Sequence, residues 1–289
     1  MQETNELALN FALKSHPGRI RPLNEDAVGA DPGIGLFILA DGLGGYNAGE
    51  VASTMTVSML LTDLGTQLAR ANGSPGTFDP TDALRNALIA MNSAIFRAAL
   101  NSAAYEGMAT TVVIAWFLGG RLWVAHAGDS RLYRLRDGQL EQVTRDHSFS
   151  QELVDAGMVS AEEARILPAK NLVTKALGAT PELEPEVHDY DVRPGDVVLM
   201  CSDGLTEMVS HLEIGGLITG CGYDVVESAR RLIDLANEAG GRDNTSVILV
   251  RVAAPESQSD AAVAQAGTVP SLATPDEAQS LQLPDPVVQ

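Results

Sequence analysis

Residues 36–50 read LFILADGLGGYNAGE, and the rest of the chain can be organised around this stretch. The apolar run 36–40 has the length and composition of a fully buried strand. It delivers one carboxylate, Asp41, into a glycine-rich turn. Asn47 and Glu50 then have the spacing of a capping box that opens a helix. Such a layout fits a tight strand-to-helix turn as well as a functional site, and this stretch alone does not choose between them.

The composition is that of a soluble, strongly acidic protein. The 289 residues suit one large domain or two small ones, and a hydrophobic share of 45% is ample for a core. A formal net charge of −19 argues against nucleic acid or an anionic membrane surface as the main partner. Cys201 and Cys221 fit no metal or disulfide spacing, and Cys201 lies in an apolar run typical of a reduced core residue. Because we find no signal peptide and no apolar run of membrane-spanning length, we expect a cytoplasmic protein.

Hydrophobic periodicity predicts an α+β domain in which groups of strands and helices alternate. Val51, Met55 and Met59 at four-residue spacing predict the apolar stripe of the first helix, and Asp79-Pro80 has the N-cap and N1 pair of a second. Short strands with tight turns over 110–143 imply an antiparallel sheet. Strands are predicted at 7–14, 36–40, 110–117, 121–127, 131–135, 139–143, 196–201 and 246–252, and helices at 48–68, from 80 onward and at 224–239.

Two segments differ in composition from the rest of the chain. Residues 146–191 contain several prolines, short helical pieces and ten acidic against three basic residues, and we interpret 148–191 as a flap. Residues 254–289 have five acids, no Lys or Arg, and repeated Ala, Gln, Ser and Pro, which predicts a disordered acidic tail. The expected organisation is one folded domain over 1–253, followed by the tail.

Four aspartates share one local design, because each lies at a predicted strand end or start beside Gly or Asn: Asp41, Asp129, Asp203 and Asp243. Asp26 is a fifth candidate. Any one of them alone is more often a turn residue, but the repetition is harder to explain in that way. Converged carboxylates repel one another unless a cation binds them. Oxygen ligands without any Cys/His spacing indicate hard ions such as Mg²⁺ or Mn²⁺ rather than zinc.

Two such ions sharing a carboxylate, about 3.5–4 Å apart, could hold a hydroxide between them and hydrolyse a phosphate ester. That reaction also needs a fixed cation to grip the phosphoryl oxygens, and an arginine fork suits this task. Arg21, five residues before Asp26 in a polar loop, is the best placed arginine. The alternative for Arg21 is a solvated loop charge.

Taken together, the motifs resemble the ordered series of the metal-dependent protein phosphatase 2C family, bacterial type. The resemblance extends over about 7–252 and implies an α-β-β-α sandwich: two antiparallel sheets flanked by helices, with the flap beside a metal cleft and 1–253 as the catalytic domain. The motifs that carry it are RPLNED at 21–26, ADGLGG at 40–45, GDSR at 128–131, DHS at 146–148, SDGL at 202–205 and GRDNTS at 241–246.

The resemblance also implies an activity and its partners. The activity is hydrolysis of phosphoserine and phosphothreonine in proteins, with a metal-bridging hydroxide attacking phosphorus. The partners are phosphorylated proteins and a bacterial Ser/Thr kinase whose action the enzyme opposes, and we expect a monomer. From the acidic flap and surface we expect phosphosites with basic surroundings to be favoured. The alternatives are an inactive phosphoprotein-binding scaffold, a dedicated phosphatase of an anti-sigma-type partner, and an unrelated acidic cation-binding protein.

Metal ligands follow from the resemblance by position in this sequence. Asp41 would bridge two catalytic Mn²⁺ or Mg²⁺ ions, and the carbonyl of Gly42 would ligate one of them. Asp203 and Asp243 would hold the other ion. Asp129, with Asp203, resembles the ligands of a third, weaker ion.

The resemblance assigns the remaining chemistry less completely. Asp26 would act through metal-bound water, and Arg21 would bind the substrate phosphate. Leu43 and Tyr46 stand where relatives place histidines that could protonate the leaving group. His16 is a stand-in for this acid, and metal-bound water is the simpler option.

Two further histidines, His126 and His147, are more often structural in such positions, and His147 could pin the base of the flap.

Overall fold

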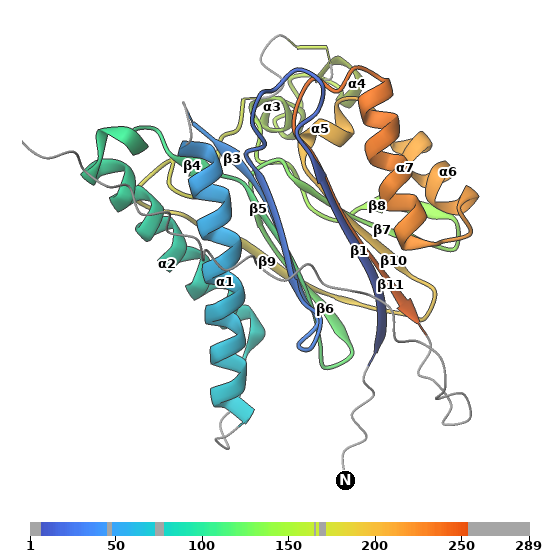
Figure 1. Ribbon diagram of the computed structural model, residues 1–289, viewed down its shortest axis with the longest axis horizontal. Coiled ribbons are helices and arrows are strands. Elements are labelled where there is room, and N and C mark those ends of the chain that lie inside the picture. The colour runs from blue at the N-terminus through green and yellow to red at the C-terminus, as the bar shows by residue number, and fades with distance from the viewer. Residues whose placement is uncertain (1–6, 45–47, 73–77, 165, 168–171, 254–289) are drawn as a thin grey trace, which may run out of the picture. The chain divides into compact units, whose positions relative to one another are not determined.

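The structure is a computed structural model that describes residues 7–44, 48–72, 78–164, 166–167 and 172–253. They all belong to one compact unit, Met1–Pro255. Two antiparallel sheets lie face to face, and a pair of helices covers the outer face of each (Figure 1). This four-layer α-β-β-α arrangement confirms the predicted fold. Asn47 of the predicted capping box, Tyr46 and the predicted tail 254–289 lie outside the described residues.

The first sheet has five strands in the order β1-β11-β10-β7-β8. Its outer face packs against the amphipathic helix α7 and its neighbour α6, which bury an apolar layer with Cys201 fully enclosed, as predicted. The strands are β1 (Ala8–His16), β11 (Thr245–Ala253), β10 (Val197–Cys201), β7 (Arg131–Arg136) and β8 (Gln139–Gln142), and the helices are α6 (His211–Gly220) and α7 (Val225–Glu238).

The second sheet has the order β2-β3-β5-β6-β9, with the short strand β4 paired to β3. Its outer face packs against α1 and α2. Helix α2 begins as predicted, with the Asp79 side chain accepting from the Thr81 N–H and proline at the first helical position. The strands are β2 (Asp26–Asp31), β3 (Leu36–Leu43), β4 (Ala109–Thr110), β5 (Val112–Leu118), β6 (Arg121–Ala127) and β9 (Glu186–Asp191), and the helices are α1 (Ala48–Asn72) and α2 (Pro80–Asn101).

Strand β3 shows why an uninterrupted apolar run is needed at the centre of this sandwich. Successive side chains of a strand point to opposite faces. Leu36 and Ile38 pack under α1 and α2, whereas Phe37 and Leu39 pack between the two sheets. Because both faces of β3 are covered, residues 36–40 are all fully buried.

The predicted apolar stripe of the first helix is partly wrong. Met59 is 47% exposed, while Leu60 and Leu64 are buried. The helix presses closely against β2, where a side chain on Gly29 would lie 2.4 Å from Cγ1 of Val57. The face of α1 that is buried is therefore the one that packs against β2. That face contains small and polar residues, so the spacing of apolar residues alone does not identify it.

The expectation that 110–143 forms one antiparallel sheet is also wrong. Strand β6 belongs to the second sheet and β7 to the first, so the chain crosses between sheets at 128–130. Gly128 has φ +114° and a Cβ there would lie 2.5 Å from the Thr111 side chain, so only glycine fits the crossing. The crossing carries the predicted metal ligand Asp129.

The remaining elements are short. The predicted flap contains α3 (Phe149–Asp155) and α4 (Ala161–Ala164), but its last residues form β9 in the second sheet. A turn of 3₁₀ helix, η1 (Ala103–Tyr105), precedes β4, and α5 (Asp203–Thr206) follows β10. Among the described helices, none combines the length and apolarity needed to cross a membrane.

Candidate metal centre

The first sheet brings three of the predicted ligands to one end of its central strands. Cys201 at the end of β10 pairs with Arg131 at the start of β7 and with Val247 near the start of β11. Asp203 follows β10, Asp129 precedes β7 and Asp243 precedes β11. Because neighbouring antiparallel strands end and begin at the same edge, these three carboxylates gather there.

The second sheet contributes two more carboxylates. Asp26 opens β2 and is the register partner of Asp41 near the end of β3. A hydrogen bond joins this pair to the first sheet, since Ser202 Oγ donates to Asp26 Oδ2 at 2.8 Å. The five candidate aspartates therefore lie at the same end of the sandwich, where the two sheets meet.

Asp26 is buried, and only one of its two carboxylate oxygens has a hydrogen-bond partner among the described residues. Its Oδ2 atom accepts from Ser202, whose hydroxyl in turn accepts from the Ser246 N–H at 3.0 Å. Its Oδ1 atom is buried and has no hydrogen-bond partner among the described residues. Burial raises the pKa of Asp26 to about 6, and nearby Asp243 adds to the rise. An unpartnered buried carboxylate oxygen is the mark of a site completed by a bound group.

Asp41 and Asp203 carry the strongest electrostatic strain. Burial raises the pKa of Asp41 well above its ordinary value, and repulsion from Asp26, Asp203, Asp129 and Asp243 adds to the effect. The pKa of Asp203 is raised in the same way, with Asp129 the largest contributor after burial. Repulsion among buried carboxylates is relieved by a multivalent cation, so the donor set fits divalent metal ions.

The backbone around Gly42 leaves no room for a side chain. A Cβ at Gly42 would lie 2.2 Å from the carbonyl oxygen of Gly49 and 2.7 Å from that of Glu25. The Gly42 N–H donates to the Glu25 carbonyl at 3.1 Å. The strand end, the start of α1 and the segment before β2 are thus in backbone contact beside Asp41.

Asp129 is held by the crossing between the sheets. The His147 N–H donates to the Gly128 carbonyl at 3.0 Å, and the Gly128 N–H donates back to His147 Nδ1 at 3.1 Å. Burial raises the pKa of Asp129 to about 6, with Asp146 adding to the rise and Arg131 opposing it.

Arg21 lies on the connection between β1 and β2 and reaches the same end. Its Nη2 atom lies 2.7 Å from Oδ2 of Asp243, and 51% of its side chain is exposed. The hydrogen bond and charge of Asp243 raise the pKa of Arg21, so the guanidinium stays charged. An exposed, charged fork beside the carboxylates is suited to an anionic ligand.

The sequence analysis missed two carboxylates in this group. Glu25 Oε1 is buried without a hydrogen-bond partner in the described chain, and burial raises the pKa of this side chain. Glu207 lies one helical turn after Asp203 and raises the pKa of both Asp203 and Asp129. The motif RPLNED already contained Glu25, and the i, i+4 spacing from Asp203 was the available signal for Glu207.

The structure shows the surroundings of two positions considered for the proton donor, Leu43 and His16. Leu43 pairs with Ala109 on β4 and offers no proton. His16 Nδ1 accepts from the Gly18 N–H at 3.0 Å and lies 3.3 Å from Asn237 Nδ2 on α7. We therefore place His16 in the packing of the β1–β2 connection.

His126, His147 and Glu186 bring three potential ligand atoms within 4.8 Å of one another. However, His147 Nδ1 accepts from a backbone N–H, which places the proton on Nε2, 3.0 Å from Glu186 Oε1. The two imidazole rings stack at 4.7 Å between centroids. These contacts describe a hydrogen-bonded packing cluster rather than a metal site, because a metal at Nε2 would require the opposite tautomer.

A cleft of about 840 Å³ opens beside the aspartates. Asp129 and Asp203 line it, together with residues of α3, α4 and α6. The segment interpreted as a flap therefore borders the cleft, next to two of the predicted metal ligands.

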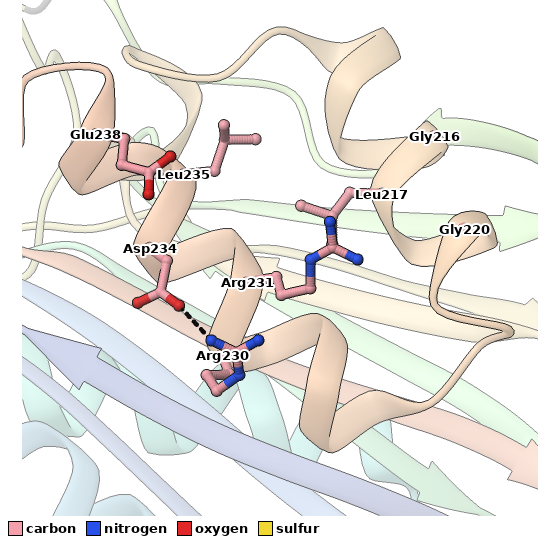
Figure 2. A pocket seen from close by; sticks show the side chains of 8 residues that line it. All are labelled: Gly216, Leu217, Gly220, Arg230, Arg231, Asp234, Leu235 and Glu238. Atoms are coloured by element: carbon pink, nitrogen blue, oxygen red, sulfur yellow. Dashed lines mark hydrogen bonds and ion pairs between the residues drawn. The ribbon is translucent and has the colours of Figure 1, made fainter.

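Figure 2 shows a second hollow, of about 420 Å³, between α6 and α7. Arg230 in this hollow pairs with Asp234 and with Glu227. Its charge is already neutralised, and none of the predicted site residues lines this hollow.

Comparison with known proteins gives one family. The sequence model described as "Protein phosphatase 2C" matches residues 20–245. The serine/threonine protein phosphatase PstP of Mycobacterium tuberculosis is 41% identical over 246 residues, which are 85% of this chain and 45% of that protein. A putative protein phosphatase 2C-type of Streptococcus pyogenes is 36% identical, over 84% of this chain and 97% of that protein. The chain thus spans under half the length of the mycobacterial relative.

Among solved structures, the catalytic domain of PstP in complex with two manganese ions is similar to this chain. It matches with a TM-score of 0.73 and 40% identity, over 86% of this chain and all of that one.

Proposed function

The chain belongs to the protein phosphatase 2C family, and on that premise we propose that it is a metal-dependent phosphatase of phosphoserine and phosphothreonine in proteins. The observation that carries the proposal is the gathering of five aspartates at one end of the sandwich, with a buried Asp26 oxygen that has no partner among the described residues. The manganese ions in the PstP structure support this assignment. The catalytic domain would span 1–253, with the flap beside the cleft.

We assign the metal ligands as the sequence predicted them. Asp41, the Gly42 carbonyl, Asp203 and Asp243 would hold two divalent ions, and Asp129 with Asp203 would hold a third, weaker ion. When bound, Mn²⁺ or Mg²⁺ supplies Lewis acidity and a nucleophile at neutral pH.

Side chains of the protein bind and orient the substrate. Arg21 binds the phosphoryl oxygens of the substrate and orients the phosphate for in-line attack by water. Asp26, whose Oδ2 atom accepts from Ser202 Oγ, would act through metal-bound water. Burial and mutual repulsion disfavour the ionised form of Asp41 and Asp203, and bound cations would stabilise it, so we expect substrate turnover to depend on the metal.

The test is turnover of p-nitrophenyl phosphate and of a phosphothreonine peptide with Mn²⁺. We expect EDTA to abolish turnover, and Asp41→Asn and Asp203→Asn each to remove nearly all of it. Activity that survives EDTA, or that persists in both variants, would overturn the metal mechanism. An inactive phosphoprotein-binding scaffold would instead bind the peptide without turning it over.

We further propose that the protein acts as a cytoplasmic monomer and opposes a Ser/Thr kinase. The acidic charge of the chain supports a preference for phosphosites with basic surroundings. Equal kcat/KM on peptides with basic and with acidic flanks would contradict that preference.

A further inference from the structure

Arg21 is the group proposed to grip the phosphate, yet little of its own side chain is packed. It is half exposed, and its ionic contact is with Asp243. Exposed ion pairs are weak, typically about 0–1 kcal/mol, and do not hold a long side chain in one place. The position of Arg21 must therefore come from the backbone that carries it.

That backbone is the connection 17–25, which leaves β1 in the first sheet and enters β2 in the second. It contains no helix or strand, so no ladder of hydrogen bonds sets its course. The Arg19 N–H donates to the Gly241 carbonyl at 2.7 Å, and the Gly42 N–H donates to the Glu25 carbonyl at 3.1 Å. These backbone contacts tie the connection to neighbouring segments on either side of Arg21, but they do not join its two ends to each other.

Two side chains join the ends of the connection: Asn24 Nδ2 donates to Ser15 Oγ at 2.7 Å at its exposed edge, and Asn244 bonds its backbone from the buried side. Asn244 Nδ2 donates to the carbonyl of Pro17 at 3.0 Å and to that of Leu23 at 2.8 Å. Its Oδ1 atom accepts from the Glu25 N–H at 2.8 Å. Asn244 is 5% exposed, and its amide uses both donors and its acceptor on backbone groups from the two ends of one connection.

We propose that Asn244 is the positioning residue that sets Arg21 for the substrate phosphate, by closing the connection 17–25 into a loop against the start of β11. This rests on the proposed function of Arg21. Asn244 follows Asp243 directly, and its own N–H donates to Asp243 Oδ1 at 2.9 Å. The same residue thus fixes the loop of Arg21 and orients the carboxylate that Arg21 contacts.

The structure offers a matched control on the far side of the second sheet. Asn92 on α2 is 1% exposed and makes the same kinds of contact. Its Nδ2 donates to the carbonyls of Thr180 and Pro181, and its Oδ1 accepts from the Gly178 N–H. Asn92→Ala therefore removes an equivalent set of bonds from 178–181, a part of the segment 148–191 that does not line the cleft, without touching the Arg21 connection.

The kinetic test compares Asn244→Ala, Asn92→Ala, Arg21→Ala and the double variant at saturating Mn²⁺. Losing the anchor should raise KM for p-nitrophenyl phosphate, and Ki for inorganic phosphate, about 10-fold, with kcat changed less than about 3-fold. Adding Asn244→Ala to Arg21→Ala should change KM by less than about 2-fold, because both act through one contact. Asn92→Ala should lower the unfolding temperature similarly but leave KM and Ki unchanged.

A conservative variant sharpens the test. Asn244→Asp keeps the acceptor for the Glu25 N–H but turns an oxygen toward the carbonyls of Pro17 and Leu23. It should raise KM at least as much as Asn244→Ala. Multiplicative effects in the double variant, or an altered Mn²⁺ requirement at unchanged KM, would overturn the proposal.

Amide hydrogen exchange separates this proposal from the assignment of the enzyme. In metal-free protein without substrate, Asn244→Ala should speed exchange across 17–25 at least about 10-fold, and Asn92→Ala should not. Unchanged exchange would overturn the anchoring whether or not the protein is active. If exchange is faster in Asn244→Ala but the wild-type protein hydrolyses no phosphate ester, the anchoring stands and its role for Arg21 is removed.

Discussion

The candidate metal centre has two halves that differ in their electrostatics: the pair Asp26 and Asp41, and the pair Arg21 and Asp243. Asp26 and Asp41 come from paired strands of one sheet, where burial raises both of their pKa values. Arg21 and Asp243 come from a connection and a strand start, remain partly exposed and already form an ion pair. The first half stores repulsion that a cation relieves, whereas the second is electrostatically balanced before anything binds. The difference indicates that Asp26 and Asp41 depend most on a bound cation, whereas Asp243, also a proposed metal ligand, already has a counter-charge in Arg21.

The largest effect should come from the buried half. Asp41→Asn removes a carboxylate that four other aspartates repel, so kcat/KM should fall at least about 1,000-fold with Mn²⁺. The same change relieves repulsion, so the metal-free variant should unfold at a higher temperature than metal-free wild type at pH 8. Calorimetry with EDTA checks this, and a lower unfolding temperature would contradict the stored repulsion.

The next effect is a pH dependence of stability without metal. Because the pKa of Asp26 is raised to about 6 in the folded state, the native protein binds more protons than the unfolded chain between pH about 4 and 6. The stabilisation that the protonated Asp26 carboxyl gives the folded state is fully present below pH about 4, and it is lost as the pH rises through about 6. Relative to Asp26→Asn, the wild-type free energy of unfolding in EDTA should fall by about 3 kcal/mol across this window, as urea titrations can measure. Mn²⁺ should reverse the trend.

A smaller effect should come from the exposed half. Arg21→Ala should raise KM for p-nitrophenyl phosphate by about 10- to 50-fold, since one charged bidentate contact is lost. The unfolding temperature should change little, because the Arg21 side chain is half exposed. Arg21→Lys should recover part of the loss, and steady-state kinetics separate KM from kcat. A change in kcat alone would place Arg21 outside substrate binding.

The smallest effect should come from an ion pair that resembles Arg21–Asp243 only in geometry. Arg230 lies 2.6 Å from Asp234 on α7, and its side chain is also 51% exposed. Arg230→Ala should change the free energy of unfolding by less than about 0.5 kcal/mol and leave KM unchanged. A KM shift comparable to that of Arg21→Ala would mean that surface charge in general, rather than the position of Arg21, governs substrate binding.

Elements with a strong local signal were predicted well. Leu84, Leu88, Met91 and Ile95 form a buried stripe on α2, and Asp79 caps that helix as expected. Helix α7 begins after its Asp224 cap. By contrast, α6 was missed, because its glycine-rich sequence HLEIGGLITG has a weak helical propensity and is stabilised by packing and by the Ser210–Glu213 capping box.

Strand β2 was missed for a related reason. Its sequence DAVGAD contains few apolar residues, and it pairs with β3 under α1. Glu25 and Glu207 were not predicted, because the sequence alone does not show which other carboxylates lie beside them. Their importance depends on which other carboxylates they face.

The sequence by itself determined the buried strand 36–40, the caps of α2 and α7, the family motifs and the set of aspartates at strand ends and starts. These features are local, since periodicity, capping and turn chemistry act within a few residues. Only the tertiary structure decided that the chain changes sheets at Gly128, that Asp26 and Asp41 share a register, and that Asn244 closes the connection bearing Arg21. The reason is that these contacts join segments far apart in the chain, whose meeting is set by the packing of the two sheets.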